Sequence, residues 1–322
     1  MSAYLKLGRA RAVPGRVTRE SELSRRQASK RDPAEFFVRF WGVRGSIACP
    51  DRASLKYGGN TSCLEVRCGG ELLIFDGGTG VRYLGNALKG RPLEAQILLT
   101  HTHFDHVCGL PFFAPFFDPA SRFGIWSGHL APSRTTYQAL TELMATPYHP
   151  VPPEIFKAHV DYHDFLPGNT IEPIPGVKVR TAPLSHPDEA CGYRIEYAGR
   201  SIAYVTDTEH VPGVLDANIL ELIEKADVFI YDAMYTDEEF PAERGKGHST
   251  WQEGVRLADA AGVGTYVPFH HEPGHDDAFM DGLARELEER RPGSIVAREG
   301  LVIAPAKERE KAPRRVTRVT AP

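Results

Sequence analysis

Four side chains that can bind a metal ion lie within six consecutive residues, at His101, His103, Asp105 and His106. His101 and His103 are two positions apart, so on an extended backbone their imidazoles point to the same side. Asp105 and His106 follow where the chain turns into a helix, and they can address a second ion nearby. Imidazole and carboxylate groups suit Zn²⁺ and also bind Mn²⁺ or Fe²⁺. The run therefore predicts a divalent metal site on a loop that leaves a buried strand, residues 95–100.

The spacing His-x-His-x-Asp-His resembles the signature of the metallo-β-lactamase superfamily. This resemblance implies three further ligands, each on a loop after a strand, and the sequence has a suitable residue in each place: His186, Asp207 and His270. It also implies two ions. One would be held by His101, His103 and His186, and the other by Asp105, His106 and His270, with Asp207 bridging both. His271 is the alternative to His270, which the family pattern favours.

A second stretch, Gly247-His248-Ser249-Thr250, resembles the ribonuclease Z and cyclic-phosphodiesterase branch of this superfamily. In that branch the histidine of a His-Ser-Thr helix start donates a proton near the scissile phosphate, which gives this role to His248. We expect Asp232, which is near in sequence, to orient it. The alternative is that Ser249 or Thr250 simply caps a helix N-terminus. The resemblance covers about residues 36–303.

Two departures from ribonuclease Z argue against tRNA as the substrate. Residues 118–176 contain few lysines and no Gly- and Lys-rich arm. His270 is followed by His271-Glu272-Pro273 instead of the usual Ser and Arg. Both departures favour a small phosphodiester.

Strand-like and helix-like segments alternate along the chain, which predicts an α/β protein. The resemblance specifies an αββα sandwich, in which two packed mixed sheets have helices outside. We expect strands at 36–43, 62–67, 71–75, 95–100, 177–183, 190–197, 201–206, 228–232, 265–269 and 295–303. Helices are expected near 81–89, 106–116, 134–145, 216–225, 250–261 and 276–291. Residues 146–176, rich in Pro, His and aromatic residues, are interpreted as a lid or a substrate-side insertion.

Charge divides the chain into three parts. Residues 1–34 hold nine Lys/Arg against three acidic residues, and residues 306–322 hold six against two. Since the whole chain carries −4, residues 35–305 carry −14. We interpret 35–305 as the hydrolase domain and the basic ends as disordered tails that could also touch nucleic acid or an acidic partner. An acidic body disfavours long polyanions such as RNA.

Five scattered cysteines form no CxxC pair, and no apolar stretch is long enough to span a bilayer. These features favour a cytoplasmic protein with no membrane partner, and a homodimer is the ordinary prior for its assembly.

The expected function is a phosphodiesterase of small or cyclic nucleotide-type esters. It would use a metal-bound hydroxide oriented by Asp105, with His248 as the proton donor. The alternatives are a tRNA 3′-processing endonuclease, a thioester, lactone or β-lactam hydrolase on the same fold, and a non-catalytic scaffold.

Overall fold

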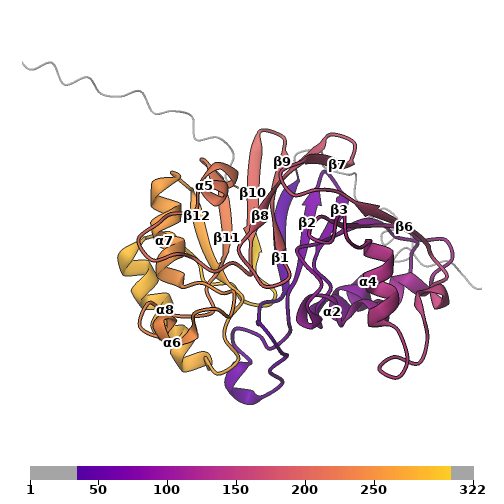
Figure 1. The fold of residues 1–322 in the computed structure, drawn as a ribbon, viewed down its shortest axis with the longest axis horizontal. Helices are drawn as coiled ribbons and strands as arrows, with labels where there is room; N and C mark the ends of the chain where they lie inside the picture. Colours follow the sequence, from indigo (N-terminus) through magenta and orange to yellow (C-terminus); the bar gives the residue numbers. More distant parts are fainter. Residues whose placement is uncertain (1–34, 306–322) are drawn as a thin grey trace, which may run out of the picture.

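A computed structural model describes residues 35–305 of the chain (Figure 1). Two β-sheets pack face to face, and helices cover the outer face of each (Figure 1). The first sheet has seven strands in the order β13-β1-β2-β3-β4-β5-β6, and the second has six in the order β12-β11-β10-β9-β8-β7. The predicted αββα sandwich of two mixed sheets is thus confirmed.

The first sheet is antiparallel from β13 to β3 and parallel from β3 to β6. Its strands are β1 (Phe36–Gly42), β2 (Cys63–Cys68), β3 (Glu71–Phe75), β4 (Glu94–Leu99), β5 (Arg122–Ser127), β6 (His159–Asp164) and β13 (Val302–Ile303). Because β3 and β4 are parallel, the loops that leave their carboxyl ends meet at one edge.

The second sheet is antiparallel from β7 to β10 and parallel from β10 to β12. Its strands are β7 (Thr170–Ile174), β8 (Val177–Leu184), β9 (Ala190–Tyr197), β10 (Arg200–Val205), β11 (Val228–Asp232) and β12 (Thr265–Phe269). The strands β8, β10, β11 and β12 all run the same way, so the loops after them also share one edge.

Apolar side chains between the sheets hold the sandwich together. Along β1 every second residue is buried, as expected for a strand with one face on the core. Phe75 of the first sheet lies edge-on to Tyr193 and Tyr204 of the second, with ring centroids 5.3 and 6.0 Å apart. This packing fixes the ends of β3 and β10 relative to each other.

The outer layers consist of short amphipathic helices. The α-helices are α2 (Gly80–Ala87), α3 (Phe104–Val107), α4 (Thr136–Leu143), α5 (Ala217–Ile223), α6 (Phe240–Glu243), α7 (Trp251–Ala260) and α8 (Asp277–Arg290). The 3₁₀ turns are η1 (Arg52–Ser54), η2 (Leu110–Phe112), η3 (Ala114–Phe117) and η4 (Pro153–Ile155). Apolar residues of α2 pack on the first sheet, and those of α5, α7 and α8 pack on the second.

Three expectations about the elements were wrong. The helix expected at 106–116 is only α3 followed by two 3₁₀ turns, because Pro111 and Pro115 cannot donate the backbone hydrogen bonds of a continuous helix. The strand expected at 295–303 is reduced to β13. β5 was not expected at all.

The segment 146–176, interpreted as a lid or a substrate-side insertion, contributes strands to both sheets. It contains β6 and β7, the edge strands of the two sheets, and the chain crosses from one sheet to the other between them. Polar residues are frequent in β6, as is common in edge strands, and this concealed the strand from the apolar pattern.

Within residues 35–305 no helix is long and apolar enough to cross a membrane. The basic segments 1–34 and 306–322, expected to be disordered, lie outside the described residues.

Candidate metal centre

The residues expected to bind metal all follow the carboxyl ends of strands, on loops or, for Asp105 and His106, in the short helix α3. His101, His103, Asp105 and His106 follow β4 in a single turn that ends in α3. The others come from the second sheet: His186 follows β8, Asp207 follows β10, and His270 follows β12. Because these strand ends share one edge of the sandwich, side chains up to 169 positions apart in sequence come together.

One group consists of His101, His103 and His186, whose donor atoms all lie within 4.8 Å of one another. The Nδ1 atom of His103 is 3.1 Å from the Nε2 atom of His186. The Oδ1 atom of Asp207 lies 3.8 Å from Nε2 of both His101 and His186. Three imidazoles and one carboxylate oxygen thus surround one point.

The second group consists of Asp105, His106 and His270. The Nε2 atom of His106 is 3.2 Å from Asp105 Oδ2 and 3.2 Å from His270 Nε2. The other oxygen of Asp207, Oδ2, lies 3.3 Å from His106 Nε2 and 3.4 Å from His270 Nε2. Asp207 therefore presents one oxygen to each group.

The chemistry of these atoms fits a pair of cations. Imidazole nitrogens 3.1–3.2 Å apart direct lone pairs at each other unless a proton or a metal ion lies between them. Nε2 of His101 is buried and has no hydrogen-bond partner among the described residues. Burial and the neighbouring His106 lower the pKa of His101 well below its usual value, so the ring is neutral and free to ligate. We infer that the residues present suit two divalent ions.

The carboxylates favour the same arrangement. Burial opposes ionisation of Asp207, but the imidazoles of His270, His106 and His101 hold its pKa well below the usual range. Burial likewise opposes charge on His106, yet Asp105 and the other carboxylates around it raise its pKa well above the usual value. The centre of the second group is therefore a position that favours positive charge, whether a proton or a metal ion.

Sequence reasoning missed Asp76, which supports the second group from behind. Nδ1 of His106 donates to Asp76 Oδ2 at 2.9 Å, which leaves Nε2 free to face the group. The same carboxylate accepts hydrogen bonds from the hydroxyls of Thr100 and Tyr204. A carboxylate behind a ligating histidine fixes its tautomer and orientation. The only sequence signal was an aspartate directly after β3.

The structure separates His270 from the alternative, His271. His270 has a φ of 62°, and its ring faces the second group. His271 points away and donates from Nε2 to the carbonyl of Ala297 at 2.9 Å. Burial lowers the pKa of His271 to about 3, so it is a neutral core residue.

His248 lies beside both groups. Its ring centroid is 5.3 Å from that of His186 and 5.1 Å from that of His270. Nδ1 of His248 donates to Asp232 Oδ2 at 2.9 Å, as expected of an orienting carboxylate. Burial lowers the pKa of His248, but the charge and hydrogen bond of Asp232 outweigh it and raise the pKa to about 9. Asp232 therefore favours the protonated ring.

The helix-cap alternative applies to Thr250 and not to His248. Thr250 is the N-cap of α7, and its hydroxyl accepts from the backbone N–H of Glu253 at 3.0 Å. The Ser249 hydroxyl is buried and pairs with Tyr231 and His210. The tripeptide thus holds a cap at its third residue and leaves its first residue free to face the metal groups.

The loop that carries His248 is tied to the first metal group. The Gly247 carbonyl accepts from Nδ1 of His186 at 2.7 Å, and the Gly247 N–H donates to Glu209 at 2.9 Å. Gly247 has a φ of 84°, and a Cβ there would lie 2.3 Å from the His186 ring, so only glycine fits. Glu209 and Gly247 were not among the predicted site residues.

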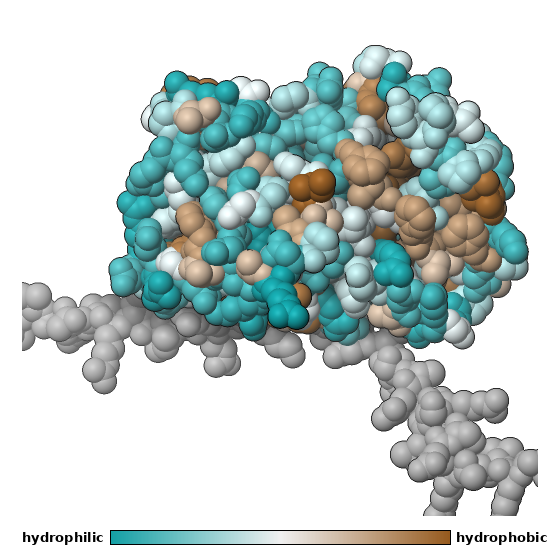
Figure 2. All heavy atoms as spheres, turned by 90° about the horizontal axis from the view of Figure 1, so that it is seen from below, coloured by the Kyte–Doolittle hydropathy of each residue, from teal (hydrophilic) through white to brown (hydrophobic). Residues whose placement is uncertain are grey.

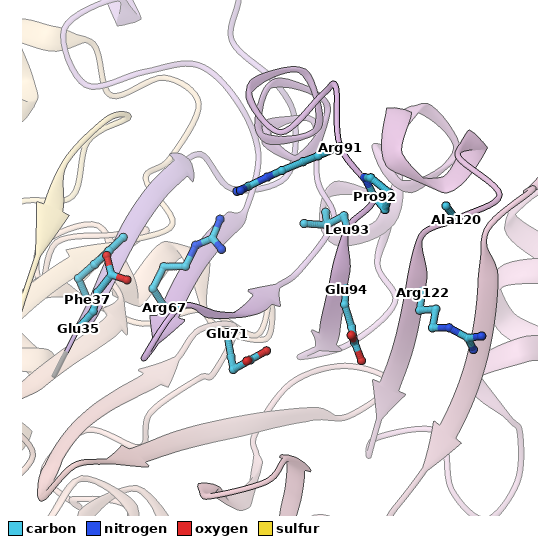
Figure 3. Close-up of a pocket in the computed structure, with 11 residues that line it drawn as sticks. Glu35, Phe37, Arg67, Glu71, Arg91, Pro92, Leu93, Glu94, Ala120 and Arg122 are labelled. Carbon is cyan, nitrogen blue, oxygen red and sulfur yellow. The ribbon is translucent and has the colours of Figure 1, made fainter. Parts of the chain in front are cut away.

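A cavity of about 600 Å³ lies elsewhere (Figure 3). It opens beside the starts of β4 and β5, at the ends of these strands opposite to the metal groups. Arg67, Arg91 and Arg122 line it together with Glu35, Glu71 and Glu94 (Figure 3). Since these charges balance and none of the candidate ligands lines it, we do not assign the chemistry to this cavity.

Two packed mixed sheets with a cluster of histidines and aspartates at their carboxyl edge define a hydrolase of the metallo-β-lactamase fold. Residues 73–271 match the Beta-lactamase superfamily domain. The chain belongs to the β-lactamase superfamily.

Several known proteins are similar to this chain. A relative named Ribonuclease Z from Mycobacterium marinum is 31% identical over 277 residues, which cover 76% of this chain and 91% of the relative. A solved structure titled a new diphosphatase from the PhnP family has a TM-score of 0.63 at 21% identity, covering 83% of this chain and 96% of that one. The short form of human tRNase Z has a TM-score of 0.61 at 19% identity, covering 84% and 100%. The two structures show a common fold.

Proposed function

We propose that this protein is a dinuclear-metal phosphodiesterase that hydrolyses small or cyclic nucleotide-type phosphodiesters. The observation that carries the proposal is the His248–Asp232 pair beside the two metal groups, 2.9 Å between Nδ1 and Oδ2. Hydrolysis of a phosphodiester expels an alkoxide, which leaves poorly without a proton. An oriented imidazolium next to the metal groups supplies what that leaving group needs.

The proposed ligands are His101, His103 and His186 for one ion and Asp105, His106 and His270 for the other, with Asp207 between them. Zn²⁺ suits these ligands best, and Mn²⁺ or Fe²⁺ are alternatives. Two such ions lower the pKa of water and neutralise charge on a phosphoryl group.

The protein's own side chains do the remaining work. Asp232 accepts the Nδ1 proton of His248, so the second proton of the imidazolium is held at Nε2, the nitrogen available to a leaving oxygen. Asp105 is held in place because its Oδ2 accepts the backbone N–H of Ser46 at 2.9 Å, and we assign it the orientation of the attacking water.

The second candidate is tRNA 3′ processing, favoured by the 31% identity to a protein named Ribonuclease Z. The net charge of −14 on residues 35–305 argues against a long polyanion as the main substrate. A thioester expels a thiolate, which needs a proton less than an alkoxide does, so the proton on His248 argues against a thioester hydrolase. A lactone also expels an alkoxide, and the hydrolysis panel decides between it and a phosphodiester.

The test is a hydrolysis panel on purified, zinc-loaded protein. It contains bis(p-nitrophenyl) phosphate, 2′,3′- and 3′,5′-cyclic nucleotides, a 1,2-cyclic ribose phosphate, a 3′-extended tRNA, a thioester and a lactone. We expect the highest kcat/KM on a small nucleotide-type diester. Preference for the tRNA would establish the second candidate, and preference for the thioester or lactone would overturn phosphodiester chemistry.

A further inference from the structure

Exposure to solvent differs among the proposed metal ligands. Among the proposed ligands the side chain of His103 is 39% exposed, while that of Asp105 is 9% exposed and those of the other five are 2% or less. A substrate that reaches the groups therefore approaches past His103.

Two exposed apolar side chains lie next to the proposed ligand Asp105. Phe104 stands between His103 and Asp105 in sequence, is the first residue of α3 and is 71% exposed. Ile47 is 65% exposed and follows Ser46, whose backbone N–H binds the carboxylate of Asp105. Single exposed apolar residues are ordinary, but these two flank the same ligand.

Further apolar side chains are exposed on one part of the molecular surface. Apolar side chains gather over the right-hand part of the face in Figure 2, on the side where Figure 1 places α2 and α4. Phe112, which is eight residues after Phe104, is a further exposed aromatic side chain, at 60%. An exposed aromatic side chain beside the metal groups, where a phosphate would bind, is suited to stack on the flat base of a nucleotide.

His103 also has an exposed acidic neighbour. Asp188 Oδ2 lies 3.5 Å from Nε2 of His103, and its side chain is 90% exposed. Glu189 follows it, and both residues are held in the left-handed region with φ of 60° and 66°. These carboxylates repel a second phosphate, so an uncharged ring suits the position beside Phe104 better than a continuing nucleic-acid backbone.

We propose that Phe104 is the platform on which the base of a nucleotide stacks while its phosphate occupies the metal groups. The proposal rests on the proposed function and deepens it, because it names the substrate as a diester whose scissile phosphate carries a nucleoside. It makes Phe104 a specificity-determining residue.

The test compares two ligands with one phosphate each, thymidine 5′-monophosphate and methyl phosphate, binding to the zinc-loaded protein in calorimetric titrations. Phe104→Ala should weaken binding of the nucleotide about 10-fold, the size of one base–aromatic stack, and leave methyl phosphate within about 2-fold. Phe104→Leu, which keeps apolar bulk without a ring, should resemble Phe104→Ala, whereas Phe104→Tyr should restore binding. Tyr83→Ala, which removes a 48% exposed aromatic ring from α2, is the matched control and should change neither ligand.

Ring-current shifts of the thymine protons report stacking directly. They should be present in the wild type and absent in Phe104→Ala. Equal binding of the nucleotide to wild type and Phe104→Ala, or equal losses for both ligands, would overturn the platform. The binding readout separates this proposal from the proposed function: stacking without hydrolysis of any diester would refute only the phosphodiesterase, and diester hydrolysis with no effect of Phe104 would refute only the platform.

Discussion

Replacement of His248 by alanine gives the sharpest test of the chemistry. The imidazole lies against Asp232 and beside both metal groups, and we assign His248 to neither set of proposed ligands, although its donor atoms group with those of Asp207, Asp232 and His270. The variant should therefore keep both metal ions and lose only the proton donor. A positioned general acid contributes about 10²–10⁴-fold, which corresponds to about 3–5 kcal/mol in the activation free energy.

The size of the loss depends on the leaving group. A nucleotide diester expels a ribose alkoxide and should lose the full 10²–10⁴-fold in kcat. A p-nitrophenyl ester expels a stable anion that departs without a proton, so the same variant should lose about 10-fold or less on it. Both rates and the metal content are measured on one preparation of His248→Ala.

A neighbouring histidine provides the matched control. His210 is bonded to the Ser249 hydroxyl at 2.8 Å and stacked on Phe240, so His210→Ala should change both rates little. Equal losses on the two substrates for His248→Ala, with both metals retained, would refute the role of proton donor. Loss of metal together with both activities would show that His248 is a ligand.

Three further predictions concern the metals and the domain boundaries. Elemental analysis should find up to two transition-metal ions per chain, and EDTA should abolish hydrolysis; metal-free protein with full activity would contradict the site. Asp207→Ala should lose both ions, because its two oxygens face the two groups. His270→Ala should lose one ion. His271→Ala should keep both ions and lower the free energy of unfolding by about 1–2 kcal/mol, because it loses the hydrogen bond to a backbone carbonyl. A retained ion count in His270→Ala with loss in His271→Ala would reverse that assignment. A chain of residues 35–305 should keep nearly the full kcat on a small diester, and a large fall in kcat would place part of the active site in a tail.

The sequence allowed much of the fold to be predicted where apolar runs are long and buried on both faces. The expected strands 190–197, 228–232 and 265–269 coincide with β9, β11 and β12. The edge strand β6 was missed because alternate residues face solvent and are polar, so it has no apolar run. The helix at 106–116 failed because apolar spacing was followed across two prolines.

The candidate site was predictable to the extent that its residues stand in a dense motif or at strand ends. His101 to His106 identify themselves by spacing, and the distant ligands follow from the order that the family resemblance implies. Asp76 and Glu209 carry no such mark: each is one acidic residue in a loop, and its role depends on a hydrogen bond that only the folded chain creates. The choice between His270 and His271 likewise required the backbone angle at the end of β12.

Asp232 uses its two carboxylate oxygens for several donors at once. One oxygen accepts both the ring of His248 and the backbone N–H of Asp207, and the other accepts the N–H groups of Met234 and Ser249. The proposed proton donor and the proposed bridging residue thus share one support. A single change at His248 would remove the proposed proton donor and leave the proposed metal ligands in place, so the variant protein would still bind metal as a receptor. A change at Asp232 offers no such separation, since it disturbs both functions together.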